Sequence, residues 1–205
     1  MYYGERFNSI SHLAGAVFAA IGTVIMVAAA ARTGDAWKIV AVSVFGATLV
    51  FLYAASTVYH SVQGRAKGVL RRFDHCAIYF LIAGTYTPFC LVTLRGALGW
   101  TFFGLAWGLA CLGVVQEFIF GKGARILSVV IYVGMGWMGA FLVAPLAEGL
   151  GPRGLALLIA GGILYTGGIA FYSFDTRIRH FHGIWHLFVL GGSIAHFLAI
   201  VIYVV

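Results

Sequence analysis

Charged residues are scarce in this 205-residue sequence. Only 9% of the residues are charged, with six acidic side chains against thirteen basic ones. A typical soluble domain carries about 25% charged residues, so this chain cannot cover a water-facing surface. The scarcity excludes soluble globular, disordered and fibrous proteins.

Cysteine is also rare. Cys76, Cys90 and Cys111 all lie inside apolar runs, and none of them forms a C-x-x-C pair. Isolated thiols in apolar runs are typical of packing residues, so the sequence indicates no disulfide framework.

Apolar residues and glycine are abundant instead. Hydrophobic residues make up 62% of the chain, and there are 28 glycines, small residues that allow membrane helices to pack closely. A membrane-spanning helix needs about 20 mostly apolar residues. The predicted fold is all-α, a polytopic membrane protein with a single domain over residues 1–205. The seven predicted spans are residues 11–31, 38–60, 74–94, 97–117, 125–145, 154–173 and 183–204.

The basic residues are distributed unevenly between the two sides that these spans define. Nine Lys or Arg residues fall on the side of the N-terminus and of the second, fourth and sixth connections, and four fall on the other side. The side richer in Lys and Arg is cytoplasmic as a rule. We therefore expect a cytoplasmic N-terminus, an external C-terminus and a location in the inner cell membrane. The same clustering explains the net charge of +7 without a nucleic-acid partner.

Ionisable residues at membrane depth gather in one predicted layer. His60 ends the second span, Asp74 begins the third, His182 and His186 begin the seventh, and His12 lies near the start of the first. All of these positions are at the cytoplasmic ends of their spans. Such groups are costly in a membrane and each is a functional hypothesis by default.

The spacing within this layer favours a metal site. His182 and His186 are four residues apart and share a helix face, as do Ser56 and His60. Three histidines and one open position are typical of a catalytic zinc site, although imidazole ligands also suit copper, iron or nickel. Asp74 would act as a base or hydrogen-bond the metal's water, and Ser56 would steady an oxyanion. One alternative is a proton relay formed by Asp74 and several of the histidines. Another is that Asp74 is an ordinary first-turn acid after the basic flank of Arg71 and Arg72.

The sequence leaves open the roles of three further polar residues, Glu5, Asn8 and His196. Asn8 is expected as the N-cap of the first helix, with Glu5 favouring the helix dipole, which leaves the burial of His12 unexplained. His196 lies ten residues after His186, too far along the axis to share its metal. It either forms a hydrogen bond in the core or lines a deeper cavity.

Gly104 and Gly108 form a G-x-x-x-G pattern that predicts a helix contact.

Taken together, the motifs resemble those of the hemolysin III proteins, the bacterial branch of the progestin and adiponectin receptor family. The resemblance covers nearly the whole chain. It rests on Glu5-x-x-Asn8-x-x-x-His12, Ser56-x-x-x-His60, Arg72-Phe73-Asp74 and His182-x-x-x-His186, with His196 ten residues later.

This resemblance implies seven helices with the N-terminus inside, and a Zn²⁺ ion held by His60, His182 and His186. Asp74 would contact the ion through water. It also implies membrane lipids as partners, since the receptor branch is linked to hydrolysis of lipid amides such as ceramide.

Two functions remain open at this point. One is a zinc-dependent hydrolase of a lipid amide, with Asp74 and Ser56 as catalytic residues. The other is a non-enzymatic regulator of membrane homeostasis, or a pore-forming cytolysin, with a structural zinc. Proton or ion transport is less favoured, because the outer half of the spans is nearly all apolar. The sequence does not fix the oligomeric state.

Overall fold

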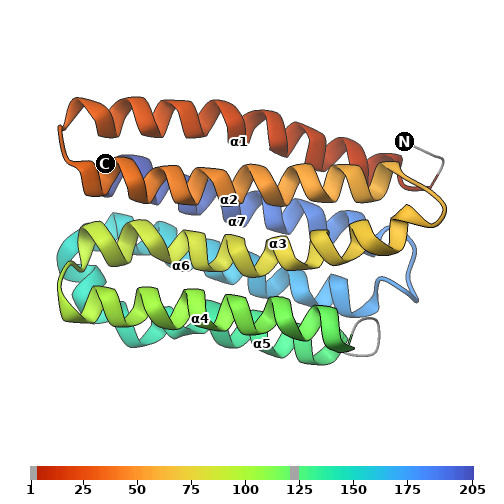
Figure 1. The fold of residues 1–205 in the computed structure, drawn as a ribbon. Helices are drawn as coiled ribbons and strands as arrows, with labels where there is room; N and C mark the ends of the chain where they lie inside the picture. The colour runs from red at the N-terminus through yellow and green to blue at the C-terminus, as the bar shows by residue number, and fades with distance from the viewer. Residues whose placement is uncertain (1–3, 121–124) are drawn as a thin grey trace.

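The computed structural model describes residues 4–120 and 125–205, which form a bundle of long helices (Figure 1). Within these residues every regular element is helical, which confirms the all-α prediction. The elements are α1 (Arg6–Arg32), α2 (Ala36–Ser61), α3 (Ala66–Pro88), the π-helical η1 (Phe89–Thr93), α4 (Ala97–Phe120), α5 (Arg125–Trp137), the 3₁₀ turn η3 (Met138–Leu142), α6 (Val143–Phe174) and α7 (Phe181–Tyr203).

Six helical stretches among the described residues are long and apolar enough to cross a membrane. Five of them each match one predicted span, apart from residues 94 and 204, which lie one position beyond the ends of Ala66–Thr93 and Phe181–Tyr203. The remaining stretch, Arg125–Phe174, contains two predicted spans. Inside it the helical backbone is broken at Gly151, where φ is 67° and ψ is 174°. Glycine adopts this conformation at no steric cost because it lacks a Cβ atom.

The helices pack mainly against their neighbours in the chain. α1 lies against α2, α2 against α3, and α6 against α7, while α1 also contacts α7. The core between them includes Phe45, Tyr53 and Ile200, each at most 2% exposed. Large apolar residues such as Phe18, Ile126 and Phe141 point outward, as expected for side chains that face lipid. α1 begins at the end of the bundle opposite to that at which α7 ends (Figure 1).

Helix α3 begins earlier than the sequence analysis predicts. It starts at Ala66, so Asp74 lies two turns inside the helix rather than at its first turn. The hydropathy criterion excludes the basic stretch before Asp74, yet Lys and Arg are good helix formers in water or at an interface. The connection between α2 and α3 is therefore only residues 62–65.

The predicted contact at Gly104 and Gly108 is wrong. A Cβ atom built on either residue meets nothing within 4 Å, so both face away from the bundle. On the same helix, the contact with α3 lies instead at Gly113, where a Cβ would come within 2.3 Å of the Tyr79 ring. The spacing of small residues does not by itself say which face of a helix meets a neighbour.

Candidate metal centre

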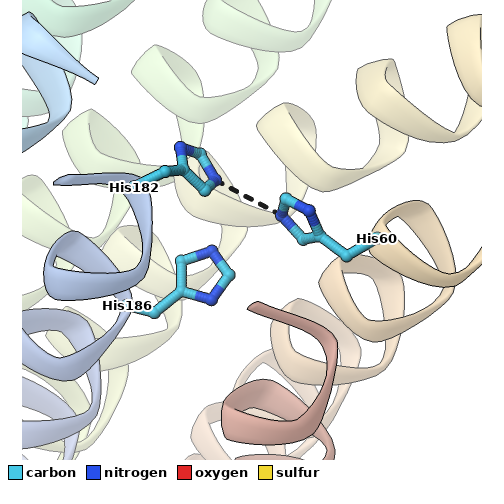
Figure 2. Close-up of side chains that lie close together, drawn as sticks. All are labelled: His60, His182 and His186. Carbon is cyan, nitrogen blue, oxygen red and sulfur yellow. Dashed lines mark hydrogen bonds between the residues drawn. The ribbon is translucent and has the colours of Figure 1, made fainter. Parts of the chain in front are cut away.

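Three imidazole rings converge at one end of the bundle. His60 comes from the last turn of α2, and His182 and His186 come from the first two turns of α7 (Figure 2). One nitrogen from each ring lies within 4.8 Å of the other two, and the Nε2 atoms of His60 and His182 are 3.3 Å apart. His60 and His186 are each 2% exposed. Among residues 4–120 and 125–205, these three form the one cluster of this kind.

The opposite nitrogen of each ring is held by an oxygen atom. His60 Nδ1 lies 2.6 Å from Glu5 Oε2, and His182 Nδ1 lies 2.7 Å from Asp175 Oδ2. His186 Nδ1 lies 3.2 Å from the backbone carbonyl of Asn8. In this arrangement each Nδ1–H donates and each Nε2 presents its lone pair to the centre. Histidines that bind metals almost always have such an outer partner.

The two carboxylates that contact His60 and His182 are kept ionised by their partners. Partial burial acts to raise the pKa of the Glu5 carboxyl, but hydrogen bonds from His60 and Asn8 and the charge of Lys67 lower it to about 2. Burial likewise acts to raise the pKa of Asp175. Hydrogen bonds from His182 and Arg125 outweigh it and hold that pKa below its ordinary value. Each carboxyl group therefore stays ionised and acts only as a hydrogen-bond acceptor toward its histidine.

The separation of the His60 and His182 nitrogens matches that expected around a tetrahedral metal ion. Two nitrogen ligands at about 2.0–2.1 Å from a tetrahedral zinc lie roughly 3.3–3.4 Å from each other. The separation of the two Nε2 atoms, 3.3 Å, matches that value. Three imidazole ligands with no thiolate suit zinc and other first-row transition metals.

Local sequence features place these side chains. His182 and His186 share a face of α7 because they are four residues apart. Gly183 allows the start of α1 to lie against α7, since a Cβ there would come within 2.5 Å of the Phe7 ring. This close approach brings Asn8 and its carbonyl to His186.

A cavity of about 1060 Å³ opens beside the three imidazoles. Asp74, Ser56 and His12 line it at the polar end together with the three imidazoles. Farther in, most of its lining is apolar, with residues such as Leu146 on α6 and Phe89 on η1. The cavity therefore joins a candidate metal site to a space that suits a hydrocarbon chain.

The other predicted polar residues have definite places. His196 also lines the cavity, and its Nε2 contacts the carbonyl of Leu158 at 3.1 Å, so both suggested roles hold. The prediction of Asn8 as N-cap is wrong, because α1 begins at Arg6 and Asn8 lies inside it. The Asn8 side chain instead donates to Glu5 Oε2 at 2.8 Å.

Sequence reasoning missed two acidic residues. Asp175 lies in the loop before α7 and holds both His182 and Arg125. Glu117 is 1% exposed on α4, where His75 lies 3.2 Å and Arg71 3.6 Å from its Oε1. The signal available in the sequence for Glu117 was an acidic residue at the end of the apolar predicted span 97–117.

The fold and the site together define a multi-pass helical membrane protein with a buried histidine cluster that could hold a metal ion. The chain belongs to the haemolysin-III related family, whose model matches residues 2–197.

Two bacterial relatives align with nearly the whole chain. It is 43% identical to the hemolysin-3 homolog of Bacillus subtilis (strain 168) over 202 residues, covering 98% of this chain and 94% of the relative. It is 41% identical to hemolysin-3 of Bacillus cereus over 201 residues, covering 98% and 91%. The monocyte to macrophage differentiation factor of Homo sapiens is 29% identical over 205 residues, covering 97% and 83%.

Proposed function

We propose that this protein is a zinc-dependent hydrolase that cleaves a lipid amide, such as a ceramide, near the inner leaflet of the cell membrane. One observation carries the proposal. Three imidazole nitrogens converge beside a cavity that is polar at their end and mostly apolar beyond. An amphiphile with its carbonyl group at the histidines and its chain in the cavity matches this division.

His60, His182 and His186 would hold the zinc. The family resemblance favours zinc over the other metals that imidazole binds, and three protein ligands leave a position open for water or substrate. When bound, zinc would lower the pKa of water toward about 7 and polarise a carbonyl group.

Two residues of the cavity wall would then act on the substrate. The Asp74 carboxylate would accept the proton of the attacking water and pass it to the departing amine. The Ser56 hydroxyl, on a side chain only 1% exposed, would donate a hydrogen bond to the carbonyl oxygen as its negative charge develops. The apolar part of the cavity would hold the acyl chain and exclude water from it.

We also propose seven membrane crossings with a cytoplasmic N-terminus. The stretch Arg125–Phe174 has 50 residues, and a continuous helix of that length would span roughly 75 Å, against a hydrocarbon core of about 30 Å. The break at Gly151 divides it into two lengths that each suit one crossing. The start of α1 and the end of α7 lie at opposite ends of the bundle, which supports an odd number of crossings (Figure 1). The metal centre would then lie on the cytoplasmic side.

The test uses purified, zinc-loaded protein in lipid nanodiscs with a fluorescent ceramide. The wild type should release the fatty acid, Asp74→Asn should lose about 10²–10⁴-fold in rate as expected for loss of a general base, and His186→Ala should be inactive. The His180→Asn variant, at an exposed histidine outside the cluster, should keep full activity. Equal release by the wild type and His186→Ala would refute the hydrolase.

A second candidate is a non-enzymatic regulator or cytolysin in which zinc is structural. One feature of the histidines favours this alternative. A metal held by His60 and His182 would cross-link α2 to α7, as a structural metal does. Under this alternative, zinc binds and stabilises the protein, but no lipid amide is cleaved and Asp74→Asn has no effect on function. The hemolysin name of the bacterial relatives makes lysis of erythrocytes the matching assay.

A further inference from the structure

The motif Glu5-x-x-Asn8-x-x-x-His12 has no part in the proposed chemistry, although all three residues line the cavity. Its ordinary explanation, a cap for α1, fails. Glu5 stands at the N-cap position, but its side chain forms no capping hydrogen bond with the helix backbone. His12 is 4% exposed, and neither of its ring nitrogens has a hydrogen-bond partner among the described residues. Capping and hydrogen bonding therefore leave the motif unexplained.

Each residue of the motif instead contacts a histidine of the cluster or supports such a contact. Glu5 Oε2 accepts hydrogen bonds from His60 Nδ1 at 2.6 Å and from the Asn8 side chain at 2.8 Å. Its other oxygen lies 3.3 Å from Lys67 Nζ. The carboxylate is thus held from three directions and fixes the plane of the His60 ring.

The same motif holds the second histidine by different means. The Asn8 carbonyl lies 3.2 Å from His186 Nδ1. The His12 ring stacks on the His186 ring with 3.6 Å between centroids and 11° between planes. The His12 ring also contacts the Tyr53 ring in an edge-to-face arrangement, with 5.0 Å between the two centroids. His12 therefore packs against the rings of both Tyr53 and His186 and would keep His186 in one orientation. The flat face of the His12 ring, rather than its nitrogens, makes the contact with His186.

We infer that Glu5, Asn8 and His12 are positioning residues that orient His60 and His186 so that both Nε2 atoms face one cation. This inference rests on the proposed metal site. Loss of an outer partner of a metal-binding histidine typically lowers metal affinity about 10–100-fold. Because the first helix contributes no ligand of its own, its effect should appear in affinity and ligand geometry rather than in metal stoichiometry at saturation.

The test measures cobalt binding to metal-free protein in detergent, by competition with a chelator and by the visible absorption spectrum of bound Co²⁺. Glu5→Ala and His12→Ala should each bind cobalt about 10–100-fold more weakly than the wild type and give an altered spectrum. His12→Phe retains a flat ring and should bind nearly as the wild type does. Glu148→Ala removes an exposed acid on α6 and should have no effect.

Thermal melting separates positioning from general destabilisation. Positioning predicts that the metal-induced rise in Tm shrinks in Glu5→Ala and His12→Ala. A variant that only loosened the fold would lower the Tm of both forms and leave that rise unchanged. Wild-type affinity and spectrum in Glu5→Ala and His12→Ala, or equal loss in His12→Phe and His12→Ala, would overturn the inference. A wild type that binds neither zinc nor cobalt would overturn the proposed metal site as well.

Discussion

At the scale of single residues, Glu117 is the clearest test of how this protein tolerates a buried charge. Its carboxylate is 1% exposed and lies near Arg71 and His75. Glu117→Ala would leave the arginine, only 18% exposed, without this partner. Breaking a buried ion pair costs about 3–5 kcal/mol, so we expect a clear fall in Tm. The exposed Glu148→Ala is the control, and a Glu117→Ala variant as stable as this control would contradict the buried pair.

Residue types and spacing were enough to predict that His60, His182 and His186 lie together. Two residues four apart share a helix face, and the ends of the spans place the three histidines at one level. Their outer partners were not predictable in the same way. Glu5 and His60 are 55 residues apart in sequence, and no periodicity indicates that the two meet. Asp175 reads in the sequence as an ordinary loop acid, and only packing of α6 against α7 brings it to His182.

At the scale of helices, close contacts at glycine should govern stability. A Cβ atom at Gly84 of α3 would come within 2.1 Å of Thr48 Oγ1 on α2, whereas one at Gly104 meets nothing within 4 Å. Overpacking of this kind costs about 1–3 kcal/mol. Gly84→Ala should therefore lower Tm, and Gly104→Ala should leave it unchanged or raise it slightly, because alanine favours a helix. The reverse order in thermal melting would contradict the helix packing.

The start of α2 predicts a dependence of stability on pH. Asp35 accepts the Trp37 amide at 2.9 Å and pairs with Arg95. Its slight burial acts to raise its pKa, but these partners lower the pKa below its ordinary value. The stabilisation is then present above the unfolded pKa, about 4, and is lost as the pH falls through the folded value. Asn caps a helix as well as Asp does, so Asp35→Asn should lower Tm at neutral pH by a margin that closes below pH 4. A margin independent of pH would contradict the ion pair.

At the scale of the whole molecule, the hydropathy pattern predicted each helix but left its ends uncertain by several residues. The largest differences are at α6, which begins at Val143 where the sequence analysis predicts a start at residue 154, and at α3, where a basic first turn continues the helix beyond the apolar stretch. The break that separates the two proposed crossings within Arg125–Phe174 depends on the backbone conformation of a single glycine, Gly151. Spans follow from composition, whereas boundaries depend on local backbone geometry.

The proposed topology can be tested with single cysteines in a variant whose three native cysteines are replaced by alanine. Thr176→Cys lies in the loop before α7 and Glu148→Cys lies on the first part of α6, and both positions are exposed. A membrane-impermeant maleimide should label position 148 in right-side-out vesicles and position 176 only in inverted ones. Labelling of position 176 in right-side-out vesicles would contradict the cytoplasmic placement of the metal centre.

The metal content of purified protein tests the central claim most directly. Elemental analysis of wild-type protein prepared without chelators should give about one zinc ion per chain, since the three histidines form a single site. His182→Ala and His186→Ala should hold far less than one, and His180→Asn should match the wild type. A wild type without stoichiometric transition metal, or full zinc content in either alanine variant, would contradict the assignment of these histidines as metal ligands.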